Sequence, residues 1–108
     1  PKALQQLEKI VKQVLDDQKF PFVLGGEHSI TIGAIRPFLK KYDNLILLHF
    51  DAHADLRNGY HGEHYSHASA IRRCLDQANL KVVSVGIRNI SAEEIPFVEE
   101  NRERIRIY

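Results

Sequence analysis

Residues 44–55 read NLILLHFDAHAD, a short apolar run followed by three polar side chains at alternate positions. The apolar run has the length of a strand rather than of a helix, and its uninterrupted character is typical of a strand buried on both faces. Asp51, His53 and Asp55 come directly after it. Because residues two apart on extended backbone project to the same side, these three side chains should converge at the end of the strand.

The chain on both sides of this stretch alternates between helical and strand patterns. Some segments repeat apolar residues at helical spacing, and others are short apolar runs that end in glycine or polar residues. We expect helices over residues 3–18, 30–41, 68–78 and from about 92, and strands over 20–26, 44–51, 82–87 and 105–108. This alternation predicts an α/β fold, a parallel sheet with helices on both faces.

Several residues mark the expected helix ends. Ser29 is placed to cap the second helix, and Glu27 is placed to complement the dipole at the same end. Pro37 lies inside that helix and should kink or split it. Ser91, followed three residues later by Glu94, forms a capping-box pattern before the last helix.

Composition and charge exclude several classes of protein. Of the 108 residues 44% are apolar, enough for a core, and the net charge of +1 indicates neither a nucleic-acid partner nor an anionic membrane surface. No apolar run approaches the roughly 20 residues of a membrane helix, and residues 1–10 have no signal-peptide core. Cys74 stands alone, which excludes an internal disulfide and fits a reducing compartment. We therefore expect a cytoplasmic protein without a membrane partner.

The two ends of the chain indicate a piece of a longer protein. The sequence begins with Pro1, and its last expected strand stops at Tyr108 without the crossover that a buried parallel strand normally needs. We expect residues 1–108 to be part of a single α/β domain.

Two polar turns should meet at the carboxyl ends of the strands, where parallel α/β sheets bind ligands. One is GGEHS at residues 25–29, which carries His28, and the other is DAHAD at residues 51–55. Carboxylates mixed with imidazoles suit Mn, Fe, Co, Ni or catalytic Zn. Two such ions about 3.5–4 Å apart can hold and deprotonate a shared water. Asp51, between the other candidate ligands, is the natural bridge.

Each candidate also has an ordinary structural interpretation. Asp and His are common on surface loops, so D-x-H-x-D alone does not establish a metal site. His49 lies one step deeper in the strand and could be a satisfied buried histidine or a partner that orients a ligand. His61 and His64 could be solvated or could line a substrate entrance. We expect Cys74 to lie in the core, and we expect ion pairs from Arg57, Arg72, Arg73 and Arg88.

Three motifs in order resemble those of the ureohydrolase family, which contains the arginases and agmatinases. They are GGEHS at 25–29, DAHAD at 51–55 and SHAS at 66–69, and the stretch HFDAHADLRNGYHGEHYSHASAIRR is most similar to the agmatinase branch. The resemblance covers about residues 20–90. It implies an arginase-like three-layer α/β sandwich with two Mn²⁺ ions at the strand ends, and hydrolysis of a guanidinium group.

The resemblance also assigns roles to residues. His28 and Asp55 would bind one Mn²⁺, His53 the other, and Asp51 both. His67 would be the catalytic histidine that protonates the leaving amine, although it could instead only cap or pack a helix. The family's later Asp-x-Asp motif has no counterpart here, since no aspartate follows Asp76; the chain is therefore expected to stop before the later metal-ligand strand.

The resemblance leaves the substrate and the activity of this chain open. Agmatine, hydrolysed to putrescine and urea, is the first expectation. Arginine, guanidinobutyrate and formiminoglutamate are alternatives within the family, and a metal-dependent deacetylase of similar fold ranks lower. A truncated, non-catalytic chain is the alternative from another class. The family also implies a homo-oligomer in the full-length protein.

Overall fold

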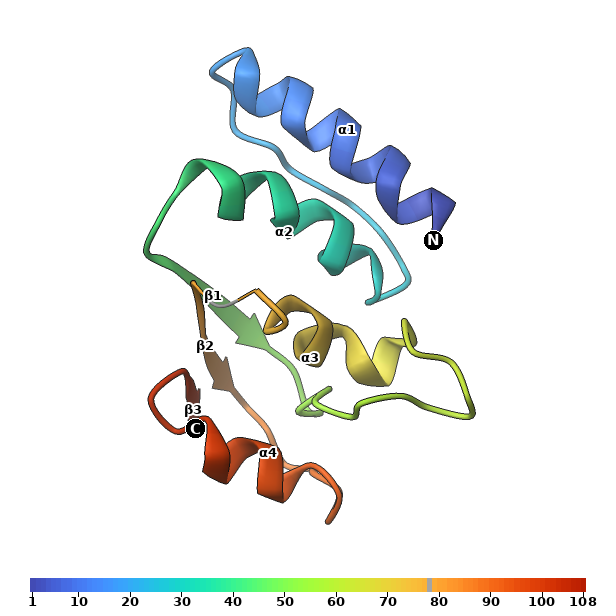
Figure 1. Ribbon diagram of the computed structural model, residues 1–108, viewed down its shortest axis with the longest axis vertical. Coiled ribbons are helices and arrows are strands. Elements are labelled where there is room, and N and C mark those ends of the chain that lie inside the picture. The colour runs from blue at the N-terminus through green and yellow to red at the C-terminus, as the bar shows by residue number, and fades with distance from the viewer. Residues whose placement is uncertain (78) are drawn as a thin grey trace.

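The computed structural model describes residues 1–77 and 79–108 and contains three parallel strands with helices between them (Figure 1). The sheet order is β1-β2-β3, with Leu45 opposite Leu80 and Val82 opposite Ile105. The elements in chain order are α1 (Lys2–Asp16), α2 (Ile30–Lys41), β1 (Leu45–Phe50), the 3-10 turn η1 (His67–Ser69), α3 (Ala70–Cys74), β2 (Leu80–Val85), α4 (Ile95–Glu100) and β3 (Ile105–Ile107).

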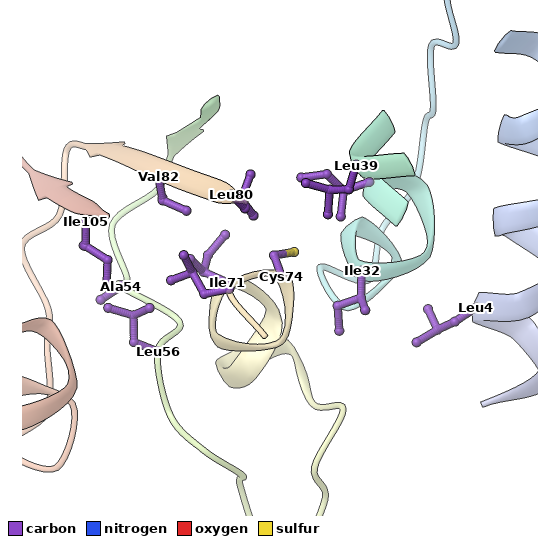
Figure 2. Close-up of a cluster of buried hydrophobic side chains, with 12 residues drawn as sticks. Leu4, Ile32, Leu39, Ala54, Leu56, Ile71, Cys74, Leu80, Val82 and Ile105 are labelled. Atoms are coloured by element: carbon purple, nitrogen blue, oxygen red, sulfur yellow. The ribbon is translucent and has the colours of Figure 1, made fainter. Parts of the chain in front are cut away.

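One face of the sheet carries the core. Alternate residues of β2 point to this face, where Leu80 and Val82 are fully buried. Figure 2 shows these side chains together with those of α2, α3 and the segment after β1. The cluster comprises Leu4, Ile32, Ile35, Leu39, Ala54, Leu56, Ile71, Cys74, Leu75, Leu80, Val82 and Ile105. The expected parallel α/β sheet is confirmed, and Cys74 lies in its core as predicted.

The opposite face of β1 is open. Ile46, Leu48 and Phe50 point away from the core and are 61%, 55% and 72% exposed. We expected helices on both faces of the sheet, but within residues 1–77 and 79–108 the buried strand side chains lie on one face only. The continuous apolar run of β1 is thus half covered.

The strand predicted over residues 20–26 is wrong. Residues 18–25 run from α1 to α2 without regular structure, and Phe20, Phe22 and Leu24 are 80–85% exposed. A strand requires a neighbouring strand for its backbone N–H and C=O groups. None of the described residues pairs with this segment, so its apolar character alone cannot make it a strand.

The helix ends follow the sequence in part. α1 buries Leu4, Val11 and Leu15, but Ile10 of the same apolar pattern is 57% exposed. Ser29 makes no side-chain cap bond, whereas Glu27 accepts the backbone N–H of Ser29 at 3.1 Å. α2 continues through Pro37 to Lys41 and is not split.

The last two helices are shorter than expected. α3 ends at Cys74, and Ala78, which the helical spacing includes, lies outside the described residues. α4 begins at Ile95 rather than near residue 92. The Glu94 carboxylate does accept the Ser91 backbone N–H, as in a capping box, but the Ser91 hydroxyl donates to the same carboxylate instead of capping the helix.

Candidate metal centre

The DAHAD segment is held at the carboxyl end of β1 by the segment that follows β2. The Asp51 N–H donates to Val85 O at 3.2 Å, and the N–H groups of Arg88 and Asn89 both donate to Ala52 O. His53 and Asn89 form an isolated parallel bridge. The sheet thus continues for a few residues beyond β1 and presents the polar side chains at its edge.

The turn before α2 places His28 against this edge. His28 Nδ1 lies 2.6 Å from Asp55 Oδ2 and 3.8 Å from Asp51 Oδ2. His28 is 27 residues from Asp55 in the chain, so the contact depends on how α2 packs beside β1. The expectation that GGEHS and DAHAD meet at one edge agrees with this geometry.

Asp51 presents its two oxygens to different imidazoles. Oδ2 lies toward His28 and, at 3.5 Å, toward His49 Nε2. Oδ1 accepts the backbone N–H of His53 at 2.8 Å and lies 3.3 Å from His53 Nδ1. The His53 side chain is 64% exposed and flanks the group from the solvent side. A carboxylate whose two oxygens face different imidazoles is suited to bridge two cations.

His49 belongs to the site more closely than its position in the sequence indicated. Its ring is buried, Nδ1 lies 3.0 Å from Ser84 Oγ, and Nε2 has no hydrogen-bond partner among the described residues. Donor atoms of His28, His49, Asp51 and Asp55 all lie within 4.8 Å of one another. The signal available in the sequence was the spacing of two residues between His49 and Asp51, which places both on one side of β1.

Asp55 reaches the group by a route that the strand argument did not predict. Its backbone φ is 54°, in the left-handed region, so residues 51–55 are not one extended segment. The convergence of Asp51 and Asp55 therefore comes from a turn rather than from strand alternation. Asp55 is 8% exposed and faces His28 across the site.

The charges in the group shift several pKa values. The hydrogen bond to Asp55 raises the pKa of His28, against the opposing effect of burial. Burial lowers the pKa of His49, and the nearby His28 lowers it further. Burial alone would raise the pKa of Asp51, but the His53 backbone hydrogen bond and the neighbouring imidazoles lower it overall. These shifts favour the ionised form of Asp51 and the neutral form of His49, which bind metal ions, whereas His28 would have to give up the proton that Asp55 favours on it before it could bind one.

A cavity of about 390 Å³ opens beside this group. His28, Asp51, His53 and Asp55 line it, together with His67 at the start of η1. His67 is exposed, and its ring packs edge-on against Tyr60 with the centroids 5.8 Å apart. The sequence interpretation missed Tyr60, Asn89 and Glu94, which also line the cavity.

The remaining polar candidates have structural partners. Arg57 pairs with Glu93 at 2.5 Å, and buried Arg73 pairs with Asp76 at 3.2 Å and contacts His64. The other two arginines differ from the ion pairs expected: Arg72 stacks on the Phe97 ring at 3.6 Å, and Arg88 donates to Gly86 O. His61 is exposed and does not line the cavity.

Comparisons with known proteins identify the family. The family model described as "Arginase family" matches residues 1–108. Agmatinase from Bacillus subtilis is 40% identical over 101 residues, which are 93% of this chain and 35% of that protein. The chain therefore spans about a third of the length of such relatives.

Solved structures agree in fold. Arginase from Medicago truncatula matches with a TM-score of 0.90 and 34% identity over 99% of this chain and 34% of that one. The agmatine ureohydrolase of Thermoplasma volcanium matches with a TM-score of 0.81 and 37% identity over 98% of this chain and 35% of that one. On the match of the family model to the whole sequence, the chain belongs to the arginase family.

Proposed function

We propose that this chain carries the part of a ureohydrolase centre that binds metal through His28, Asp51, His53 and Asp55, and that the whole protein hydrolyses the guanidinium group of agmatine to give urea and putrescine. The observation that carries the proposal is that His28 and His53 lie beside different oxygens of Asp51 while Asp55 contacts His28, in a chain of the arginase family.

The donor set fits a divalent metal such as Mn²⁺. Neighbouring ligands around an octahedral ion with bonds of about 2.1 Å lie about 3 Å apart, and the contacts among His28, Asp51 and Asp55 are 2.6 and 3.8 Å. The unpartnered His49 Nε2 faces the same carboxylate oxygen and adds a further donor. Imidazole with carboxylate suits Mn²⁺ among other transition metals. Because the chain spans about a third of its relatives, we propose that further ligands lie outside it.

Metal ions bound here would supply a nucleophile from water, since coordination lowers the pKa of the bound water. The chain's own residues would orient it. Asp51 would offer an oxygen to each side of the centre, and the His53 backbone N–H donates to Oδ1 and fixes its position. A hydrogen bond between the His49 imidazole on β1 and the Ser84 hydroxyl on β2 fixes the orientation of His49.

We propose that His67 donates a proton to the leaving amine. It lines the same cavity as the candidate ligands and is open to solvent, so it can exchange protons with water. An imidazole titrates near neutral pH, which suits a general acid that must protonate an amine before the C–N bond breaks. Tyr60 packs against its ring and limits its orientation.

The first experiment measures Mn²⁺ binding by calorimetry and urea release from agmatine, for the intact chain and for Asp51→Ala. We expect binding that Asp51→Ala abolishes. Asp43→Ala is the matched control, because Asp43 is an exposed carboxylate before β1 that does not line the cavity. If the intact chain binds no Mn²⁺, the proposed metal centre is wrong.

The product assay then separates the alternatives. Arginine and guanidinobutyrate serve as competing urea-releasing substrates, and formiminoglutamate is followed by formamide release. In the full-length protein, agmatine should be turned over fastest if the agmatinase interpretation holds. Mn²⁺ binding by the full-length protein without turnover of any of them would favour a non-catalytic metal-binding role. We also propose a cytoplasmic, homo-oligomeric full-length protein with a single α/β domain.

A further inference from the structure

Glu94 is a buried carboxylate that the proposed reaction does not use. It is 4% exposed and lies just before α4. Its Oε1 accepts the backbone N–H of Leu56 at 2.8 Å. Its Oε2 accepts the backbone N–H of Ser91 at 2.7 Å and the Ser91 hydroxyl at 2.8 Å. Hydrogen bonds to a charged acceptor offset the cost of burying it, so this carboxylate is a fixed anchor and not a free charge.

The anchor acts on the residue next to Asp55. The left-handed conformation of Asp55 is uncommon for a residue other than glycine, so its surroundings must hold it there. The Asp55–Leu56 peptide has both polar groups engaged. Its C=O accepts the Arg72 backbone N–H at 3.1 Å, and its N–H donates to Glu94. Together these bonds fix the orientation of the peptide.

Glu94 connects this peptide to a distant part of the chain. It is 38 residues from Leu56, and its bonds to Ser91 tie it to the segment after β2. Arg72 approaches from the other side, where its guanidinium also lies 3.5 Å from Leu56 O and stacks on Phe97 of α4. The position of Asp55 thus depends on the start of α4 as well as on β1.

We propose that Glu94 is a positioning residue: by holding the Asp55–Leu56 peptide, it keeps Asp55 in its left-handed conformation and its carboxylate against His28, where the metal would bind. The metal-binding part of this inference rests on the proposed function. The conformational part does not, because it concerns the metal-free chain.

The test compares the intact chain with Glu94→Ala. Two measurements are made without metal: amide hydrogen exchange at Leu56, and the Asp55 one-bond Cα–Hα coupling constant, which distinguishes positive from negative φ. Calorimetry then gives the Mn²⁺ dissociation constant. The matched control is Glu93→Gln. Glu93 is the carboxylate next to Glu94 in the chain, is 59% exposed and pairs with Arg57, the residue that follows Leu56.

We expect Glu94→Ala to exchange the Leu56 amide at least about tenfold faster and to lose the positive-φ coupling of Asp55. The Mn²⁺ dissociation constant should rise about 10- to 100-fold, the range for residues that orient metal ligands. Glu93→Gln should leave all three values unchanged. If the β1 and β2 amides of Glu94→Ala remain protected from hydrogen exchange, the fold is intact. Weaker Mn²⁺ binding in that variant then cannot come from a loss of fold stability alone.

Two results would overturn the inference: an unprotected Leu56 amide in the intact chain, or a Glu94→Ala variant with unchanged Asp55 coupling or Mn²⁺ affinity. If the intact chain binds no Mn²⁺, the proposed function fails and the two metal-free measurements decide the role of Glu94. Should Glu94→Ala lose its native spectrum, Glu94→Gln takes its place. Glutamine can keep the Leu56 bond, so Glu94→Leu is measured beside it; leucine accepts no hydrogen bond, and an Mn²⁺ affinity of Glu94→Leu equal to that of Glu93→Gln overturns the inference.

Discussion

Asp55 and Cys74 show how differently single residues depend on the fold. Asp55 is useful only in a backbone conformation that its own preferences disfavour, so the surrounding hydrogen bonds determine its role. Cys74 is 1% exposed among apolar neighbours, and burial raises the pKa of its thiol to about 12. The thiol is therefore neutral at physiological pH and acts as a small apolar side chain, not as a nucleophile.

The raised pKa of Cys74 makes stability depend on pH in the alkaline range. The unfolded thiol ionises near the reference pKa of 9.0, whereas the folded thiol stays neutral until about 12. Its contribution is therefore fully present below about pH 9 and is lost as the pH rises toward 12. By this linkage, the free energy of unfolding should fall about 1 kcal/mol more between pH 7 and 10 than in Cys74→Ala. Urea unfolding at both pH values measures it; equal pH dependence in the two proteins would contradict the buried thiol.

At the scale of elements, α1 and α2 approach most closely at Gly33. A Cβ added there would lie 2.7 Å from the backbone oxygen of Leu4, which cannot move away as the end of a flexible side chain could. α1 and α2 pack side by side (Figure 1), and Glu8 links them through Lys40 at 2.9 Å. The glycine therefore sets how near α1 can lie.

Gly33→Ala should separate the two helices. Overpacking of this kind typically costs about 1–3 kcal/mol in the free energy of unfolding, and urea denaturation measures the change. Gly26→Ala serves as the control, because nothing lies within 4 Å of the Cβ it would add. The control should change stability by less than about 0.5 kcal/mol. Equal effects of the two substitutions would mean that α1 does not pack on α2 in solution.

At the scale of the molecule, an apolar surface on the open face of β1 remains uncovered, where Ile46, Leu48 and Phe50 are all more than half exposed. Phe20 and Phe22 before α2 are more than half exposed as well. Exposed apolar surface promotes association. No helix among the described residues is long and apolar enough to span a membrane.

We expect this surface to make the isolated chain associate as its concentration rises. Leu48→Lys and Phe50→Lys together should shift the sedimentation coefficient toward that of the monomer without lowering the free energy of unfolding, since both side chains point away from the core. Lys81→Glu, an exposed change on the neighbouring strand β2, controls for an effect of charge alone. A chain that sediments as a monomer at all concentrations would contradict the expectation.

Local patterns in the sequence predicted much of this molecule. The apolar run before Asp51 and the helical spacing around Cys74 placed a strand and a core helix correctly, although the run indicated burial on both faces of the strand and only one face is covered. The strand expected at Phe22 failed because pairing needs a partner, which no local pattern reports. Asp55 was expected to converge with Asp51 by strand alternation, whereas it does so through a turn held by Glu94. That contact spans 38 residues and lies beyond the reach of spacing arguments.

The parallel arrangement of β1, β2 and β3 has a consequence for how the chain folds. Every strand pairing is separated by a helix, so no hairpin can form early and guide the rest. His49 and Ser84, which face each other across β1 and β2, are 35 residues apart, and His28 and Asp55 are 27 apart. The chain loses the entropy of closing these loops before the strand pairings can stabilise it. This order slows folding in proteins dominated by distant contacts. The proposed metal ligands are drawn together by such distant contacts, so they should meet only late in folding.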